Sequence, residues 1–111
     1  MTTKPSTGEK ETMHSAFCDV TSERAGRYLA QLCKHFAHKI SVEWDATKGR
    51  ADFAFGVCDM AVEGDRLRLT CSAASEEALA KIKYIVEDHI VRFAWRENLE
   101  VVWSPASAGP P

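Results

Sequence analysis

Two histidines near the end of a predicted helix are the residues of this chain best suited to chemistry. His35 and His38 are three positions apart, so their imidazoles leave neighbouring parts of one helix surface, beside the apolar stripe. A pair at this spacing is one way for a single helix to offer two metal ligands. Structural zinc needs four ligands and catalytic zinc needs three plus water, so the pair alone does not make a site.

Cationic side chains accompany the two histidines. Such a cluster can receive a carboxylate, a phosphate or an acidic partner. We interpret it as a candidate site for a small anionic ligand or a metal complex. The residues predicted to bind that ligand are His35, His38, Lys34, Lys39 and Arg50. A solvated helix face that aids solubility is the commoner origin of such a pattern, and this alternative remains open.

A third imidazole is expected at the same corner. If the first strand runs antiparallel to the following helix, the start of the strand meets the end of the helix, and His14 lies near His35 and His38. These three are the candidate metal ligands, with iron or zinc as the metal. Three interpretations of the His35–His38 pair stay open: solvated residues favoured by the negative helix end, a pocket for a small molecule or anion, and a metal site. His89 is expected to be half-buried in the core and hydrogen-bonded.

Hydrophobic periodicity supplies the elements that must position these residues. A first helix with its N-cap at Thr21 or Ser22 is expected to run to about Lys39, and a second to begin after an N-cap at Ser75. Gly64-Asp65 is a typical hairpin turn. The strands predicted from alternating polarity are 14–20, 40–44, 51–55, 57–63, 67–71 and 99–103.

The order of these elements predicts the fold. The order is β-α-β-β-β-β-α-β, and connections of hairpin length make the sheet mainly antiparallel, with two one-sided helices packed on one face. We therefore expect a two-layer α+β sandwich. Gly56 either closes the third strand or marks a bulge, in which case the third and fourth strands are one. One domain over residues 13–104 is expected, between disordered tails at 1–12 and 105–111.

Composition limits the function classes. The chain has 111 residues, a formal net charge of −2 and four cysteines, expected to be reduced and buried. The absence of a signal peptide and of a long apolar run predicts a cytoplasmic protein without a membrane partner. Nucleic-acid binding is not expected without a larger basic excess. Catalysis finds little support, because no catalytic motif is present and Cys33 lies in the apolar stripe.

Three segments carry a resemblance to a known family. They are RYLAQLCKHFAHKISVEWD, KGRADFAFGVCDM and HIVRFAWRENLEVVW, within residues 14–103. Together they resemble the prokaryotic domain of unknown function 2218 family. Its most specific element is Arg27-Tyr28-Leu29 followed by Leu32-Cys33-Lys34-His35-Phe36 and His38-Lys39. Arg96-Glu97 matches further along, and Trp95 stands where Phe is expected. The family has no settled activity. Related domains are sometimes joined to siderophore-interacting flavin reductases. The resemblance therefore implies a role in handling iron or siderophores.

Two functional hypotheses follow. The first is an accessory binding domain that holds a metal complex, a siderophore or another anionic small molecule at the helix end. The missing motifs favour binding over catalysis. The second is a protein-interaction module without a small ligand, for example a homodimer. In that case the open face of the sheet would carry Trp44 or Trp103.

Overall fold

The first strand forms where polarity alternates, because its even-numbered side chains face the protein interior. The structure, a computed structural model, describes residues 14–106. Its elements in chain order are β1 (His14–Thr21), α2 (Ala25–Phe36), β2 (Ser41–Trp44), β3 (Lys48–Phe53), β4 (Gly56–Glu63), β5 (Arg66–Ala73), α3 (Glu76–Phe93), a 3-10 turn η1 (Trp95–Glu97) and β6 (Ser104–Pro105).

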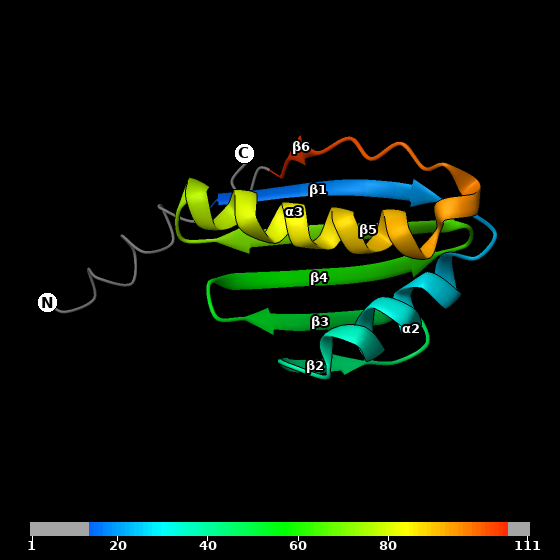
Figure 1. The fold of residues 1–111 in the computed structure, drawn as a ribbon, viewed down its shortest axis with the longest axis horizontal. Coiled ribbons are helices and arrows are strands. Elements are labelled where there is room, and N and C mark those ends of the chain that lie inside the picture. Colours follow the sequence, from blue (N-terminus) through cyan, green and yellow to red (C-terminus); the bar gives the residue numbers. More distant parts are fainter. Residues whose placement is uncertain (1–13, 107–111) are drawn as a thin grey trace, which may run out of the picture.

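The strands form one sheet in the order β2-β3-β4-β5-β1-β6, and every neighbouring pair is antiparallel. Both helices cover the same face of this sheet (Figure 1). The predicted α+β class and element order are therefore confirmed. In Figure 1, α3 lies along the strands while α2 crosses them obliquely toward β2, and this difference in direction shapes the space between the helices.

The core lies between the sheet and the two helices. Each strand turns alternate side chains toward the helices, and each helix contributes one apolar stripe. The side chains that are fully buried there include Cys18, Leu29, Leu32, Cys33, Cys58, Leu67, Leu69, Cys71, Ile82, Val86 and Ile90. All four cysteines are free and buried, as expected. Neither described helix is long and apolar enough to cross a membrane.

The first helix is shorter than predicted at both ends. Thr21 is still part of β1, and the Ser22 hydroxyl accepts from the Arg24 amide 2.9 Å away, before the helix begins. Ser22 thus holds the strand-to-helix turn rather than capping the helix. At the other end, residues 37–39 form turns. The second helix starts as predicted, since the Ser75 hydroxyl accepts from the Ala78 amide at 3.1 Å.

Gly56 neither closes a strand nor forms a bulge. Phe53 pairs directly with Gly56, so residues 54 and 55 make a two-residue turn and β3 and β4 are separate strands. Gly56 also lies close beneath α3. A Cβ atom at this position would be 2.3 Å from Cδ1 of Ile82 and 2.4 Å from the carbonyl oxygen of Ser72. Only glycine fits this approach without displacement.

The predicted final strand was wrong in its position. Residues 99–103 form no ladder, and the pairing comes only at Ser104 and Pro105, beside β1. The alternation that suggested a strand has another cause: Leu99, Val101 and Trp103 pack against the core along the chain's return path. Pro105, predicted to begin the C-terminal tail, lies in the sheet. The predicted tails otherwise fall outside the described residues, apart from Ala106.

Neither predicted tryptophan lies on the open face of the sheet. Trp103 donates from Nε1 to the Glu87 carboxylate of α3 at 3.0 Å, so it lies on the helix side. Trp44 shares its side of β2 with Val42, whose partner Ala51 is fully buried beneath the helices. The open face instead carries polar side chains, many of them paired across strands.

Candidate functional site

The space between α2 and α3 contains two neighbouring hollows. The helices are antiparallel and come closest where α2 begins and α3 ends, then diverge (Figure 1). The first hollow, about 610 Å³, is called the basic hollow and is lined by Arg24, Arg27, Tyr28, Ala30, Gln31, Lys34, Phe93, Ala94, Trp95, Arg96 and Glu97. The second, about 440 Å³, is called the imidazole hollow and is lined by His35, Phe36, His38, Lys39, Ile40, Phe53, Phe55, Ile85 and His89.

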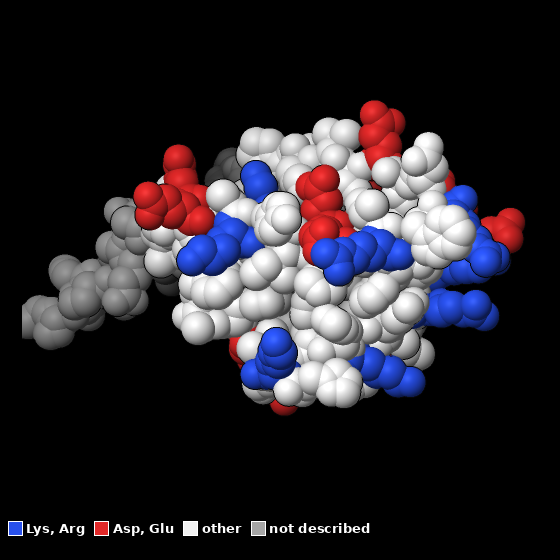
Figure 2. Space-filling model, viewed as in Figure 1, with Lys and Arg blue, Asp and Glu red and all other residues white. Residues whose placement is uncertain are grey.

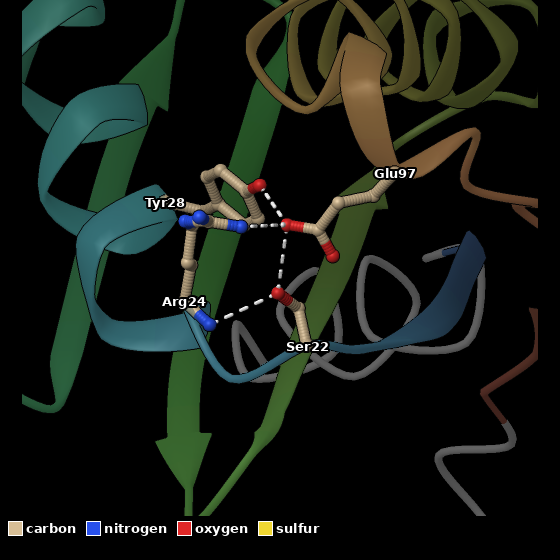
Figure 3. Close-up of polar contacts among 4 residues, drawn as sticks. All are labelled: Ser22, Arg24, Tyr28 and Glu97. Carbon is tan, nitrogen blue, oxygen red and sulfur yellow. Dashed lines mark hydrogen bonds and ion pairs between the residues drawn. The ribbon is translucent and has the colours of Figure 1, made fainter.

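A carboxylate anchors one end of the basic hollow (Figure 3). Glu97 Oε2 accepts from the Ser22 hydroxyl at 3.0 Å, from the Tyr28 hydroxyl, and from Arg24 Nη1 at 3.4 Å. The three donors come from the start of α2 and the turn before it, whereas Glu97 comes from η1. This network therefore joins the first helix to the segment that follows the second.

The same network sets the ionisation of its members. Hydrogen bonds from Tyr28 and then Ser22 hold the pKa of the Glu97 carboxyl below its ordinary value, so it is a carboxylate at neutral pH. Burial, followed by the bond to Glu97, raises the pKa of the Tyr28 phenol. Tyr28 is thus a fixed donor that remains protonated. Neither group is poised to exchange a proton near neutral pH.

The other cations of the basic hollow face open space. Within residues 14–106, Arg27, Lys34 and Arg96 form no ion pair with a carboxylate. The Arg96 guanidinium lies over the Trp95 ring at 4.9 Å, and Trp95 is 69% exposed. Lys and Arg side chains gather at this end of the molecule in Figure 2. An unpaired cationic cluster beside an exposed indole is suited to an anionic ligand.

His35 and His38 both line the imidazole hollow. The histidine that contacts His35 there is His89, which the sequence analysis had placed in the core. The ring centroids of His35 and His89 are 4.6 Å apart, and His89 is half-buried with Nδ1 2.7 Å from the carbonyl oxygen of Ile85. The expectation of a half-buried, hydrogen-bonded His89 is confirmed. Since a carbonyl only accepts, Nδ1 carries the proton and Nε2 of a neutral His89 has a free lone pair.

The predicted corner of three histidines does not form. His14 lines a different hollow with Glu76 and Trp103, at the start of β1 and the first turns of α3. The prediction assumed a helix lying back along its strand, but α2 crosses the sheet obliquely and ends over β2 and β3. No group of three or more His, Cys, Asp or Glu residues within 14–106 is arranged to hold a metal ion.

The predicted cations are also divided. Lys34 lines the basic hollow and Lys39 the imidazole hollow. Arg50 lies on the open face of the sheet, where it pairs with Asp59 at 3.5 Å and Asp52 at 3.6 Å. Arg50 is therefore separated from the helix groove by the thickness of the sheet.

The buried cysteines form no reactive site with these residues. Cys33 lies in the core with its Sγ 3.7 Å from Met60 Sδ, and burial raises the pKa of its thiol to about 11. Cys58 and Cys71 are direct cross-strand partners beneath α3. Their mutual hydrogen bond, and then burial, raises the pKa of the Cys58 thiol, so it stays protonated.

Sequence reasoning missed the network at Glu97 and the exposed Trp95. The signal that could have found them was the resemblance itself. Arg27-Tyr28 and Arg96-Glu97, which both match the family, are about seventy positions apart in the chain, yet they line one hollow. Their convergence makes the basic hollow the stronger candidate for a functional site.

The fold and the groove together define a small two-layer α+β domain with a cationic hollow between its helices. The chain belongs to the family described as "Uncharacterized protein conserved in bacteria (DUF2218)", which it matches over residues 18–104. The resemblance found in the sequence is thereby confirmed. No curated protein matches the chain.

A solved structure shares the fold. The chain is similar to PA4090 from Pseudomonas aeruginosa, whose structure was determined by NMR, with 34% sequence identity and a TM-score of 0.73. The similarity covers 86% of this chain and 99% of PA4090. The two-layer arrangement therefore extends to a relative of nearly the same domain size.

Proposed function

We propose that this protein is an accessory binding domain that holds an anionic small molecule in the basic hollow. The observation that supports this function is the presence of three cations, Arg27, Lys34 and Arg96, that line one hollow without a carboxylate partner among the described residues. Each arginine offers a planar fork of donors that matches a carboxylate or phosphate group. The fixed carboxylate of Glu97 already has three donors of its own, of which Arg24 carries the opposite charge.

The chemistry of the lining limits the ligand class. Three cations favour a ligand with more than one negative charge, and the Gln31 amide and the Trp95 indole can add a hydrogen bond and a flat apolar surface. Polycarboxylates, phosphates and anionic metal complexes such as ferric siderophores meet these conditions. Arg27, Lys34 and Arg96 are all exposed, so water reaches every cation, and this favours binding over catalysis.

Isothermal titration calorimetry tests the proposal with citrate, pyrophosphate, a ferric hydroxamate and a ferric catecholate. The Arg27→Ala/Arg96→Ala variant is expected to lose at least about tenfold in affinity for the anion that binds the wild type. Arg50→Ala is the matched control, since it removes an exposed arginine that lies on the open face. Equal affinity in the wild type and the double variant would remove the basic hollow from the function.

A protein-interaction module is the second candidate. It is favoured by β2, a short strand at the edge of the sheet, and by Trp44 on it, which is 39% exposed. A homodimer through this edge would show a mass that rises with concentration in light scattering. This candidate would be refuted if the wild type were a monomer at every concentration and the mass of the Trp44→Ser variant were the same.

A further inference from the structure

The imidazole hollow has an apolar floor that no described element covers. Phe53 and Phe55, at the β3–β4 turn, and Ile40 and Ile85 line it and are only half-buried. The rings of Phe53 and Phe55 lie 5.8 Å apart, and Phe36 meets Phe53 edge-on at 5.3 Å. Small-molecule sites are commonly hollows of about 300–1,000 Å³ lined by such rings. A flat aromatic group would find ring faces and edges on several sides.

The rim of the same hollow carries basic side chains from every element that contributes an ionisable group to it. The end of α2 and the turn after it contribute His35, His38 and Lys39. From α3 come His89, Lys81, whose Nζ lies 5.2 Å from the Phe55 ring, and Arg92. On α3, the carboxylate of Asp88 pairs with Arg92 at 3.2 Å. Phe53 and Phe55, which line the hollow from the β3–β4 turn, carry no charge.

We infer that the imidazole hollow binds an aromatic monocarboxylate, with the ring against Phe53 and Phe55 and the carboxylate toward Lys39 and the imidazoles. The apolar floor selects a ring, and the cationic rim selects a single negative charge beside it. This inference goes beyond the proposed function, since it concerns a different hollow and a different ligand class from the polyanions expected in the basic hollow.

Binding at this site is coupled to a proton. Partial burial, then the neighbouring His89, His38, Lys39 and Arg92, holds the pKa of His35 below its ordinary 6.5, so His35 is neutral at pH 7 in the free protein. A bound carboxylate favours the imidazolium and raises that pKa. The complex therefore takes up a proton, and affinity rises as the pH falls through the pKa of the complex.

The test compares 2-naphthoate with naphthalene-2-carboxamide, which has the same ring system and no charge. Binding is measured by calorimetry at pH 8 and pH 6, where the naphthoate stays ionised, and located by amide shifts in ¹H–¹⁵N NMR spectra. We expect naphthoate to bind at least about fivefold tighter than the amide, to tighten about threefold to tenfold at pH 6, and to shift the amides of residues 53–55 and 85–89.

Variants separate this site from the basic hollow. Lys39→Ala should weaken naphthoate binding severalfold, His35→Asn should reduce its pH dependence, and Arg27→Ala should change neither. Equal affinity for naphthoate and the amide, or a pH dependence unchanged in His35→Asn, would overturn the inference. Shifts confined to Trp95 and Arg96 would also overturn it, while leaving the proposed function of the basic hollow intact.

Discussion

The two faces of the sheet are built from similar strands but obey different physical rules. On the helix side, the side chains are small or apolar and fully buried, such as Ala51, Cys58 and Cys71. On the open side, charged residues pair across strands, as Asp19 does with Arg68 at 2.8 Å and Glu63 with Arg66 at 2.7 Å. Close packing determines which side chains fit on the helix side, whereas pairing of opposite charges determines the side chains on the open side.

The comparison indicates where a ligand can bind. The arginines of the open face that are described above already have carboxylate partners, and the helix side of the sheet has no space. The outer groove between α2 and α3 combines two hollows with cations, for example Arg27 and Lys34, that form no ion pair within residues 14–106. The helices thus provide both the cover for the core and the binding surface.

Gly56→Ala should have the largest effect, because it breaks the close packing of the helix side. The added methyl group would meet Ile82 at 2.3 Å and the Ser72 carbonyl oxygen at 2.4 Å, so α3 or the β4–β5 pair must shift. We expect a loss of about 2–4 kcal/mol in the free energy of unfolding, measured by urea denaturation.

Gly26→Ala is the matched control for that substitution. Gly26 lies in α2, and a Cβ there meets nothing within 4 Å. Alanine should stabilise the protein by about 0.5–1 kcal/mol, because it restricts the unfolded chain and favours the helix. A Gly56→Ala variant as stable as the wild type would show that α3 does not approach the sheet as closely as described.

Tyr28→Phe should have the next largest effect, because it removes a buried donor from the Glu97 network. Tyr28 is 4% exposed and its hydroxyl donates to Glu97 Oε2. Loss of a hydrogen bond to a charged acceptor should cost about 1–2 kcal/mol by urea denaturation, with no change in the core. An unchanged midpoint would mean that the contact between α2 and η1 adds nothing to stability.

The Glu97 carboxyl should make a smaller contribution that depends on pH. Its pKa in the folded protein lies below the ordinary 4.5, so its contribution is present above that pH and is lost as the pH falls through the folded value. The wild type should therefore lose stability between pH 5 and pH 3 more steeply than Glu97→Gln, which cannot titrate there. Parallel curves of unfolding free energy against pH would contradict this.

Sequence periodicity predicted the fold well because burial alternates strictly along β1 and β5 and follows one stripe on each helix. It failed where an apolar pattern had another cause. Residues 99–103 alternate because Leu99, Val101 and Trp103 cover the core, not because they pair in the sheet. Gly56 was ambiguous in the sequence, because a glycine is expected both where a helix approaches the sheet closely and where one strand ends and the next begins.

The candidate site was only partly predictable. Helical spacing placed His35 and His38 on one side of the first helix, beside its apolar stripe, and both do line the imidazole hollow. The angle at which α2 crosses the sheet depends on tertiary packing, and it separated His14 from the other two. The partner that His35 did acquire, His89, is more than fifty positions away, and no local pattern joins them.

The smallest effect is expected on the open face, at the Asp19–Arg68 pair. Arg68 binds both carboxylate oxygens of Asp19 at 2.8 Å, and its guanidinium lies 4.2 Å from the centre of the Phe17 ring. The bond to Arg68 lowers the pKa of Asp19. Because the pair is partly exposed to water, a double-mutant cycle with Asp19→Asn and Arg68→Gln should give a coupling of only about 0.5–1 kcal/mol.

Salt distinguishes this pair from the packed face. Coupling between Asp19 and Arg68 should fall when the cycle is repeated in 1 M NaCl, whereas the cost of Gly56→Ala should not, because screening acts on exposed charges and not on steric overlap. A coupling above about 3 kcal/mol, or one that salt leaves unchanged, would mean that the open face is shielded from water. It would then have to be covered in solution, and the distinction between the two faces would fail.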